Sequence, residues 1–339
     1  MKERKLIEQI RRLASSSKNK AVVRGIGDDC AILRPRPGYQ ILVTTDFCIE
    51  NVHFRRAWHP ADSVGHRCLA RGLSDIAAMG GTPLACFLSL GLPQNGRPQK
   101  LPQKWTDNLL RGLHSLARRF HVQLAGGDIS AAGEILADII VLGDVPAGKA
   151  IRRSGARAGD RIYVTGALGG SAAVLKQLFA GKKIKAAKSN RHFYPQPRIA
   201  AGLWLQQRSL ATSSIDLSDG LSVDLAHICQ ESGVSALIRA ADIPVARNSN
   251  LELALHGGED YELLFTASAR ANVPRRIAGV AITEIGVILK RTNYSSAIQI
   301  LGHNGRVRPL AQGGWEHFRG QKNPSRRRAG KEVSSSNFE

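Results

Sequence analysis

Three aspartates lie within nine residues of the segment SSIDLSDGLSVDLAHICQ, which covers Ser213–Gln230. The neighbours of Asp216, Asp219 and Asp224 are small or apolar. Acids on a solvated helix face usually lie among lysines and glutamates, and the whole chain carries 48 lysines and arginines against 27 acids. We therefore interpret these carboxylates as candidates for binding chemistry.

Five further segments place an acid beside glycine, serine or threonine at the end of an apolar run. The small residue lets the backbone turn tightly, so the carboxylate projects from a loop on a rigid scaffold. The segments are GIGDDCAIL (Asp28, Asp29), LVTTDF (Asp46), GLSDIAAMGG (Asp75), AGGDIS (Asp128) and GGEDYELLF (Glu259, Asp260).

Carboxylates that converge on one pocket repel one another and raise each other's pKa unless a cation neutralises them. Oxygen ligands without cysteine suit a hard ion, Mg²⁺ or Mn²⁺, which commonly holds nucleotide phosphates. For any single segment a turn or a helix N-cap is an equally good explanation. Spacing alone does not establish that the acids meet in space.

The segment YVTGALGGSAAVL has the strand, glycine turn and helix of a phosphate cradle, because helix N-terminal amides attract anions. It lacks the glycine and lysine spacing of a P-loop and the G-x-G-x-x-G fingerprint. The protein-kinase motifs H-R-D and D-F-G are also absent from the sequence. A nucleotide enzyme with this sequence would be neither a P-loop enzyme nor a protein kinase.

Short apolar runs and amphipathic stretches must position these acids. The runs YQILVTTD, PLACFLSLGLP, VQLAGGD and ILADIIVLGDV predict strands, and ADSVGHRCLARGLSDIAAMGG and KWTDNLLRGLHSLARRF predict helices. A shift to Gly, Ala and Arg near 146–160 marks a domain boundary. Because strands and helices do not strictly alternate, we expect an α+β fold with two domains, at 1–145 and 146–318, and a basic, disordered tail at 319–339.

Composition narrows the class of protein. The 339 residues carry a formal net charge of +21, which we attribute to a basic surface and tail rather than to nucleic-acid binding, since no stacking aromatics accompany the charge. The five cysteines are scattered without a C-x-x-C pair, which argues against disulfides and structural zinc and favours the cytoplasm. No apolar run of membrane-spanning length occurs, and the N-terminus predicts a first helix rather than a secretion signal.

Taken in order, eight segments resemble the thiamine-monophosphate kinase family over about 25–318, within the superfamily of aminoimidazole ribonucleotide synthetase. They are GIGDDCAIL, TTDFCIENVHF, LSDIAAMGGTP, GGDIS, RSGARAGDRIYVTGALGGSA, SSIDLSDGLSVDLAHI, HGGEDYELLF and GWEHF. The resemblance implies an aminoimidazole ribonucleotide synthetase-like fold with a C-terminal α/β sandwich. It also implies a homodimer formed by pairing the N-terminal sheets, and transfer of the ATP γ-phosphate to thiamine monophosphate.

The resemblance also implies a set of site residues. Mg²⁺ positions fall on Asp29, Thr44, Thr45, Asp46, Asp75, Asp128, Asp216 and Asp219. ATP positions fall on Gly127, Asp128, Arg153 and Ser218, and substrate positions on His53, Glu259 and Trp315. Two departures from the family pattern are TTDFCIENVHF in place of T-T-D-T-L-V-E-G-V-H-F, and Ile129 where threonine is common.

The residue types fit this reaction without a general base. A phosphate monoester has a second pKa of about 6, so the acceptor is already mostly a dianion at neutral pH. The obstacle is repulsion, since two unit charges 4 Å apart repel by about 4 kcal/mol at an effective dielectric near 20. Several divalent ions held by aspartates would remove that obstacle.

Two other hypotheses use the same residues. One keeps the fold and changes the acceptor, as in other ATP-dependent members of the superfamily, although the chain lacks the N-terminal cysteine in a glycine-rich loop expected of selenophosphate synthetase. The other is nucleic-acid binding, which would be strongly salt-dependent and would reside in the tail.

Overall fold

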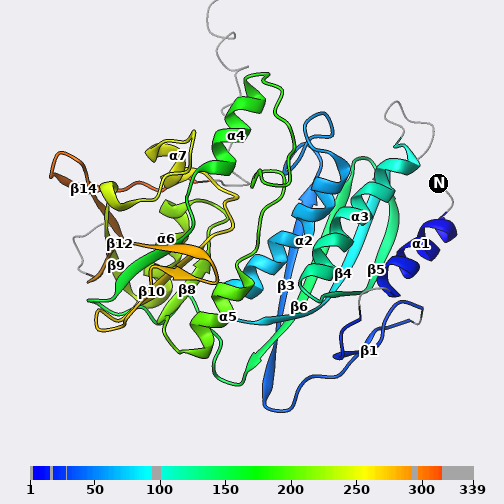
Figure 1. Ribbon diagram of the computed structural model, residues 1–339, viewed down its shortest axis with the longest axis horizontal. Coiled ribbons are helices and arrows are strands. Elements are labelled where there is room, and N and C mark those ends of the chain that lie inside the picture. The colour runs from blue at the N-terminus through cyan, green and yellow to red at the C-terminus, as the bar shows by residue number, and fades with distance from the viewer. Residues whose placement is uncertain (1–2, 16–17, 28, 94–100, 292–296, 315–339) are drawn as a thin grey trace, which may run out of the picture.

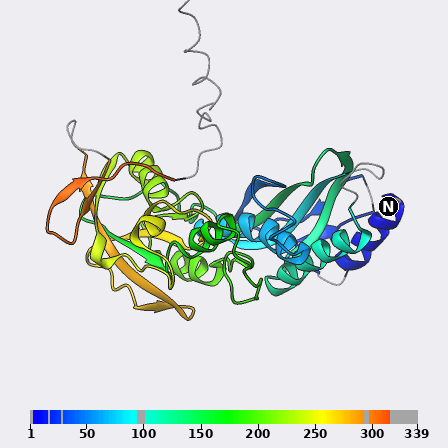
Figure 2. The same ribbon diagram turned by 90° about the horizontal axis from the view of Figure 1, so that it is seen from above.

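The computed structural model describes residues 3–15, 18–27, 29–93, 101–291 and 297–314. The molecule is elongated, and two sheets with their helices occupy its two ends (Figures 1 and 2). Asp28, Trp315 and the predicted tail at 319–339 lie outside the described residues. Within the described ranges, no helix combines the length and the apolar character needed to cross a bilayer.

The N-terminal half is built on a four-stranded sheet with the order β3-β6-β4-β5. Its β4 and β5 strands run parallel, and the other pairs are antiparallel. The strands are β3 (Tyr39–Ile49), β4 (Thr82–Pro93), β5 (Gln123–Ala132) and β6 (Leu136–Pro146). A separate two-stranded ribbon, β1 (Val22–Arg24) and β2 (Ile32–Leu33), and the helix α1 (Glu3–Ser15) precede them in the chain.

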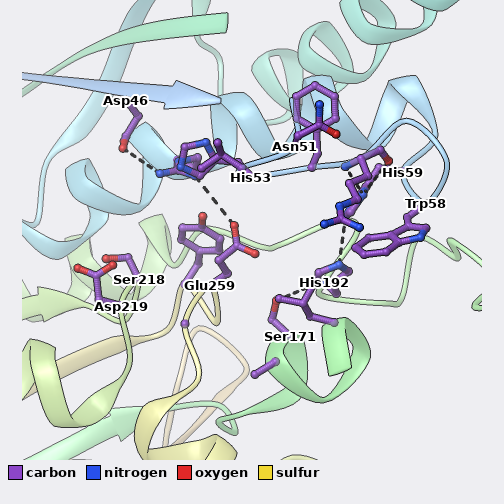
Figure 3. Close-up of a pocket in the computed structure, with 18 of the residues that line it drawn as sticks. Asp46, Asn51, His53, Trp58, His59, Ser171, His192, Ser218, Asp219 and Glu259 are labelled. Atoms are coloured by element: carbon purple, nitrogen blue, oxygen red, sulfur yellow. Dashed lines mark hydrogen bonds and ion pairs between the residues drawn. The ribbon is translucent and has the colours of Figure 1, made fainter. Parts of the chain in front are cut away.

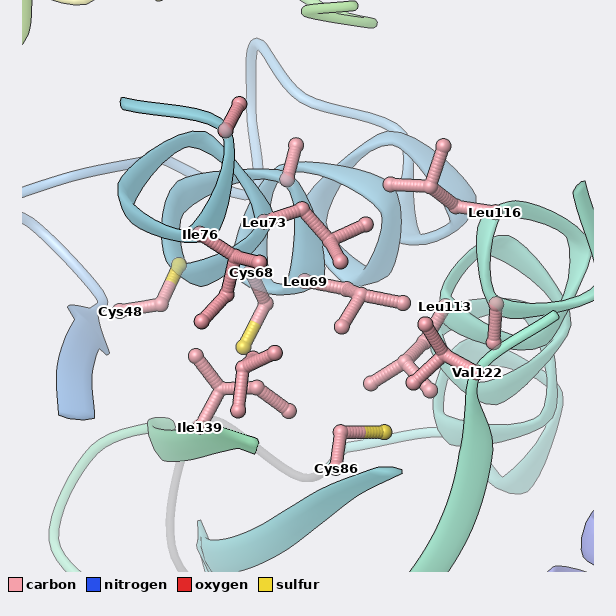
Figure 4. Close-up of a cluster of buried hydrophobic side chains, with 14 of the residues drawn as sticks. Cys48, Cys68, Leu69, Leu73, Ile76, Cys86, Leu113, Leu116, Val122 and Ile139 are labelled. Atoms are coloured by element: carbon pink, nitrogen blue, oxygen red, sulfur yellow. The ribbon is translucent and has the colours of Figure 1, made fainter. Parts of the chain in front are cut away.

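Two helices, α2 (Ala61–Ala78) and α3 (Gln103–Arg119), lie side by side on one face of this sheet (Figure 1). They approach closely because glycines face each other: a Cβ on Gly65 would lie 1.9 Å from the Leu109 carbonyl oxygen, and one on Gly112 would lie 1.8 Å from that of Asp62. Leucines, Ile76 and buried cysteines fill the space between helices and sheet (Figure 4). All five cysteines of the chain are free thiols.

The C-terminal half is built on an eight-stranded sheet with the order β14-β13-β9-β12-β7-β10-β8, and β11 pairs with β12 at its side. Most pairs are antiparallel, whereas β13 runs parallel to β9. The strands are β7 (Arg161–Thr165), β8 (Ser213–Asp216), β9 (Val234–Arg239), β10 (Leu263–Ala267), β11 (Arg276–Ile277), β12 (Val280–Lys290), β13 (Ile298–Leu301) and β14 (Val307–Pro309).

Helices cover this second sheet and join it to the first half. The helix α6 packs on strands β8, β9, β10 and β13, and α5 packs on α2, which also contacts β8. One apolar core therefore continues from the first sheet into the second half, where it includes Leu205 and Phe265. The helices are α4 (Gly170–Phe179), α5 (Ile199–Gln207), α6 (Leu221–Ser232) and α7 (Leu251–His256), with a 3-10 turn at Ala240–Asp242.

The structure confirms the predicted α+β class and the strands and helices expected in the first half. The apolar run at 236–245 forms a strand only to Arg239, and the chain then turns at Ala240–Asp242. The strand and the helix expected in YVTGALGGSAAVL are β7 and α4; α4 ends at Phe179, and the chain turns at Gly181, which has a φ of 77°. The domain limits at 145 and 318 stay predictions.

Candidate active site

A cavity of about 530 Å³ opens between the two halves of the molecule. Residues from both halves line it, so we call it the interdomain cavity (Figure 3). Its lining includes Asp46, Asn51, His53, Trp58, Arg71, Asp75, Phe179, His192, Asp216, Ser218, Asp219, Glu259 and Tyr261. Seven of these are residues that the sequence analysis assigned to metal, ATP or substrate: Asp46, His53, Asp75, Asp216, Ser218, Asp219 and Glu259.

The helix α2 presents a charged stripe to the interdomain cavity. Arg67, Arg71 and Asp75 follow one another at intervals of four residues, which places them on one face of a helix. Arg67 and Arg71 are largely buried, with 3% and 17% of their side chains exposed. Asp75 was identified from the sequence and the two arginines were not, although all three lie among the small and apolar residues of the same helix.

Three carboxylates from three elements meet at one end of the cavity. Asp46 comes from β3, Asp75 from α2 and Asp216 from β8, so both halves contribute. Burial raises the pKa of Asp216 to about 7, and the charges of Asp224 and Asp46 add to the effect. Burial together with the charge of Asp216 raises the pKa of Asp75 to about 7. The charges of these carboxylates therefore interact, which is what was expected of acids that share one site.

Asp46 and Asp75 have protein partners in this arrangement. A guanidinium nitrogen of Arg71 lies 3.5 Å from the Oδ1 of Asp46, and it offsets part of the burial that raises the pKa of Asp46 to about 6. The Thr44 hydroxyl donates a hydrogen bond to Asp75. In the described part of the chain, no three acidic, histidine or cysteine side chains form a ready metal cage. A cation would thus have to draw these carboxylates away from their present partners.

The loop after β8 is held by the third aspartate of the opening segment. Asp224 Oδ2 accepts hydrogen bonds from the backbone amides of Ser218, Asp219 and Gly220, at 3.1, 3.2 and 3.0 Å. Gly220 has a φ of 115° and lies against the backbone of His256, a conformation that favours glycine. Asp224 therefore positions the loop that carries Ser218 and Asp219 into the cavity, a role that sequence analysis left unassigned.

Glu259 lies in the middle of the cavity and is paired with arginine. Its Oε1 lies 2.6 Å from Arg67 and 4.0 Å from Arg71. Burial opposes ionisation of Glu259, but the charges of Arg67, His192 and Arg71 prevail and lower its pKa to about 2. Glu259 and Tyr261 both have positive φ, 63° and 51°, and such strained backbone is typical of functional loops.

His53 lies beside Glu259 and forms part of the same wall (Figure 3). Its Nδ1 accepts a hydrogen bond of 3.0 Å from the backbone amide of Ile49. The Arg67 guanidinium also donates to the His53 carbonyl at 3.2 Å. Arg67 thus ties together two of the residues that the resemblance assigned to substrate.

Other predicted residues lie elsewhere. Asp29, Gly127 and Asp128 line a second pocket of about 520 Å³ in the N-terminal half, between β5 and the 25–31 segment. The Thr45 hydroxyl donates to Asp138 at 2.8 Å, on the opposite face of β3 from Thr44, because successive strand residues alternate. Arg153 is exposed, but its charge reaches the cavity and lowers the pKa of both Asp75 and Asp216.

The glycine-rich turn before α4 already holds an anion of the protein itself. Asp260 accepts hydrogen bonds from the amides of Gly169 at 2.6 Å and Ser171 at 3.3 Å. These amides belong to the first turn of α4 and to the residue before it, where a phosphate would have to bind. In the described structure, amides of the possible phosphate cradle in YVTGALGGSAAVL are therefore occupied by a side chain, while Ser171 and Ala172 also line the interdomain cavity.

Comparison with known proteins gives consistent matches along the chain. Family models for the N-terminal and C-terminal domains of AIR synthase related proteins match residues 27–145 and 157–298. The chain is 39% identical over 276 residues to thiamine-monophosphate kinase of Escherichia coli (strain K12), covering 78% of this chain and 81% of that protein. It is 32% identical over 316 residues to thiamine-monophosphate kinase of Bacillus subtilis (strain 168), covering 87% and 93%.

Solved structures give the same picture. Thiamine-monophosphate kinase from Stenotrophomonas maltophilia K279a superposes with a TM-score of 0.74 at 33% identity, over 87% of this chain and 95% of that one. AaThiL in complex with AMPPCP and TMP superposes with a TM-score of 0.73 at 29% identity, over 94% and 99%. The hydrogenase maturation protein HypE in complex with ATP, at 15% identity and a TM-score of 0.73, shares the fold.

Proposed function

Since this chain belongs to the thiamine-monophosphate kinase family of AIR synthase related proteins, we propose that it transfers the γ-phosphate of ATP to thiamine monophosphate. The products are thiamine diphosphate and ADP, and the reaction serves thiamine biosynthesis. One observation carries the proposal: Asp46, Asp75 and Asp216, which come from both halves of the chain, line the same cavity. The chain is also similar to known kinases over most of its length. A complex of a relative with AMPPCP and TMP supports the same pair of ligands.

The protein has to position the two substrates and screen their phosphate charges from each other; it does not have to remove a proton from the acceptor. The acceptor phosphate is mostly ionised at neutral pH, since its second pKa is about 6. No residue of the cavity is therefore assigned as a general base. Asp224 fixes the loop of Ser218 and Asp219, and Arg67 fixes Glu259 and the His53 backbone, so the walls of the cavity are set before ligands enter.

We propose Mg²⁺ as the cation of the acidic end, held by carboxylates among Asp46, Asp75, Asp216 and Asp219 and by the Thr44 hydroxyl. The donors are all oxygen atoms, which Mg²⁺ prefers. Burial raises the pKa of Asp75 and Asp216, and nearby carboxylates raise it further, so the pair carries the cost of burying like charges without a cation. When bound, Mg²⁺ supplies positive charge that screens phosphate oxygens from one another.

The ATP-contact residues are assigned on the family resemblance. Ser218 lines the interdomain cavity, and Arg153 places its charge on the same acidic end. Gly127 and Asp128, with Asp29, line the separate N-terminal pocket. We propose that this pocket becomes part of an ATP site when a second subunit is present. Trp315, the third proposed substrate residue, lies outside the described residues.

We propose a homodimer formed through the face of the N-terminal sheet that α2 and α3 leave open. Strand β3 is an edge of this sheet, and Ile41, Val43 and Phe47 expose 38%, 64% and 53% of their surface. A long edge strand with exposed apolar side chains requires cover in a soluble protein. Five free thiols suit a reducing compartment, and we propose the cytoplasm.

The dimer can be tested by light scattering after size-exclusion chromatography. We expect the wild-type chain to elute as a dimer and Val43→Asp to elute as a monomer, because a buried charge without a partner is costly. The matched control is Val307→Asp, which alters a valine that is 52% exposed on β14 in the other half. A wild-type monomer, or a V43D dimer, would refute the proposed interface.

The activity can be tested by coupling ADP formation to NADH oxidation. We expect ADP only when ATP, Mg²⁺ and thiamine monophosphate are all present, and no ADP when EDTA replaces free Mg²⁺. Thiamine and thiamine diphosphate serve as alternative acceptors, because they bear the same rings without the monoester phosphate. Turnover of another phosphate acceptor in preference to thiamine monophosphate would contradict the proposed substrate and favour the hypothesis of a changed acceptor.

A further inference from the structure

The segment 188–196 borders two cavities. His192 lines the interdomain cavity, whereas several of its neighbours line a separate pocket of about 460 Å³, which we call the basic pocket. Its lining consists of His66 of α2, of Ser115, Leu116 and Arg119 of α3, and of Lys188, Ser189, Arg191, Tyr194 and Gln196. None of these described residues is acidic, and Arg119, Lys188 and Arg191 each carry a full positive charge.

Arg191 is the least compensated of these three cations. It forms no ion pair with any described residue, and the acid whose charge favours its ionised form is Glu262. That carboxylate already accepts hydrogen bonds from Arg198 at 2.6 Å and from Thr165 at 2.5 Å. Partial burial lowers the pKa of Arg191, and the charges of Arg198 and Arg119 lower it further. A bound anion would relieve this repulsion among like charges.

The other two cations differ in their partners. The Arg119 guanidinium donates to the side-chain oxygen of Gln196, which is neutral. The Lys188 Nζ lies 2.8 Å from an oxygen of Asp62, which also accepts a hydrogen bond of 2.9 Å from the Tyr194 hydroxyl. One of the three positive charges is therefore compensated by a carboxylate, and the two guanidinium charges are left for a ligand.

We propose that the basic pocket binds the phosphate group of a small molecule, with Arg119 and Arg191 as its main contacts. Two uncompensated guanidinium groups match the double negative charge of a phosphate monoester, and each can offer two parallel N–H donors to phosphate oxygens. The hydroxyls of Ser115 and Ser189 add donors in the same lining. This site is separate from the interdomain cavity and takes no part in the proposed phosphoryl transfer.

The dimensions and the lining favour a small ligand over a nucleic acid. A volume of about 460 Å³ lies in the range of pockets for small organic molecules and exceeds the space that a bare phosphate ion fills. Binding of single-stranded nucleic acid would require open aromatic faces for stacking. The Tyr194 ring is buried, with the Lys188 Nζ 3.8 Å from its centre and the edge-on His66 ring 5.3 Å away, so its faces are not open to a base.

The wall of the basic pocket is fixed before a ligand enters. Burial lowers the pKa of His66 to about 4, so the ring is neutral at pH 7, and its Nε2–H donates to the Pro195 carbonyl at 2.7 Å. The next residue of α2, Arg67, donates to the His192 carbonyl. Two consecutive residues of α2 thus hold the segment that carries Arg191. A preformed wall lowers the entropic cost of binding an anion.

Calorimetric titration in EDTA tests the site with two probes, inorganic phosphate and glycerol 3-phosphate. Without a divalent ion the acidic end of the interdomain cavity repels phosphate, so binding there is disfavoured. We expect Arg191→Ala and Arg119→Ala each to weaken binding of both probes about ten-fold, and the double variant to abolish it. Arg191→Lys should weaken binding less, because it keeps the charge and loses only the planar fork.

The matched control is Arg111→Ala. Arg111 is an exposed arginine of the same helix, α3, and it does not line the basic pocket. We expect its replacement to leave the affinity for both probes at the wild-type value. Equal losses in Arg111→Ala and Arg191→Ala would show general attraction to a basic surface and overturn the proposal. Unchanged affinity in both Arg119→Ala and Arg191→Ala would overturn it as well.

Comparison of the probes identifies the source of the phosphate group. Tighter binding of glycerol 3-phosphate would support an organic phosphate, and equal binding would support the free ion. Both results require the two arginines and therefore uphold the site. Salt-sensitive binding of single-stranded RNA that requires these arginines, without binding of either probe, would replace the proposal with a nucleic-acid surface.

Melting curves give a second readout that does not depend on kinase activity. At equal ionic strength, phosphate should raise Tm over sodium chloride more in the wild type than in the Arg119→Ala, Arg191→Ala double variant. An equal rise in both proteins would show that phosphate acts only as a salt excluded from the surface, and would refute the site. Both arginines are accessible to solvent, so we expect the double variant to keep its fold, which circular dichroism checks.

Discussion

Two groups of buried charge face the interdomain cavity, and they differ in how they are compensated. At its centre, Glu259 contacts Arg67 at 2.6 Å; burial opposes its ionisation, but the nearby charges, that of Arg67 above all, lower its pKa to about 2. At the acidic end, Asp75 and Asp216 lie close to other carboxylates, and burial with repulsion raises both pKa values to about 7. The arginines around Glu259 outweigh its burial, whereas the charges of Arg71 and Arg153 do not offset the burial and repulsion of Asp75 and Asp216.

This difference in charge compensation indicates which buried charges stabilise the fold and which serve ligand binding. A compensated ion pair stabilises the fold around it, and breaking it exposes a buried charge to an apolar environment. A cluster of like charges destabilises the unliganded fold, and it persists where ligand binding requires it. Removing a charge should therefore have opposite consequences for stability at the two places.

The largest effect is expected for Asp216→Asn. Activity with thiamine monophosphate should fall about 1,000-fold, equal to about 4 kcal/mol, because the amide cannot hold a cation as the carboxylate does. Thermal stability should stay the same or increase, since one repelling charge is removed. Coupled assay and calorimetry measure the two quantities. The control is Asp242→Asn, because Asp242 is a half-buried acid that pairs with Arg239 away from the cavity lining. Full activity in Asp216→Asn would refute the metal role.

The second effect concerns the compensated pair. Arg67→Ala should lower the free energy of unfolding by about 3 kcal/mol, because Glu259 would lose its closest cation. Lys188→Ala is the matched control, since Lys188 is 71% exposed and lies 2.8 Å from Asp62. Its removal should cost less than about 1 kcal/mol. Urea denaturation measures the free energy of unfolding of both variants. Equal losses in Arg67→Ala and Lys188→Ala would contradict the distinction between the buried and the exposed ion pair.

Third, pH should act on the two groups in opposite directions. The pKa of Asp216 is about 7 when folded and 3.8 by reference, so its effect on stability becomes unfavourable as pH rises from 4 to 7. The pKa of Glu259 is about 2 when folded and 4.5 by reference, so its stabilisation is present above 4.5 and is lost as pH falls toward 2.

Melting curves of wild type and Asp216→Asn in EDTA, at pH 5 and pH 8, measure this dependence. The variant should gain Tm over wild type at pH 8 and little at pH 5, with each kcal/mol shifting Tm by roughly 2–4 °C. Mg²⁺ at pH 8 should stabilise wild type more than the variant. A difference in Tm that does not change with pH would contradict the raised pKa.

The smallest effect tests the two neighbouring threonines. Thr44→Val removes the hydroxyl that donates to Asp75 and should reduce kcat about five-fold, the size of one hydrogen bond of about 1 kcal/mol. Thr45→Val removes a hydroxyl on the other face of β3 and should have a smaller effect. Coupled assays at saturating Mg²⁺ compare them, and a larger loss in Thr45→Val would show that the open face contributes to catalysis.

Much of the fold was predictable because local patterns decide it. Alternating or continuous apolar runs became β3, β4, β5 and β6, and the periodic leucines of 105–120 became most of α3. Local patterns are weaker where a turn follows a strand: the apolar run at 236–245 leaves the sheet after Arg239. The glycine-rich turn before α4 suggested a phosphate cradle, but Asp260, far away in the sequence, fills it.

Most acids of the candidate site were identified from the sequence, whereas Arg67 and Arg71 were not. Small, apolar neighbours identified Asp75 and Asp216 as unusual, and the same reasoning applied to Arg67 and Arg71 would have placed them on the stripe with Asp75. Trp58 and Phe179 carry no such signal, because each is an ordinary apolar residue in its own segment. Their contact joins a loop of the first half to the end of α4 in the second.

Residue type and local spacing alone specify which carboxylates are out of place in this basic chain, and which segments become strands and helices. They do not specify partners, because an ion pair such as Arg67–Glu259 joins residues 192 positions apart. Packing of α2 against both sheets brings Asp46, Asp75 and Asp216 together and sends Asp29 and Asp128 to another pocket. Electrostatic energy depends on distance and burial, and these quantities exist only once the chain has folded.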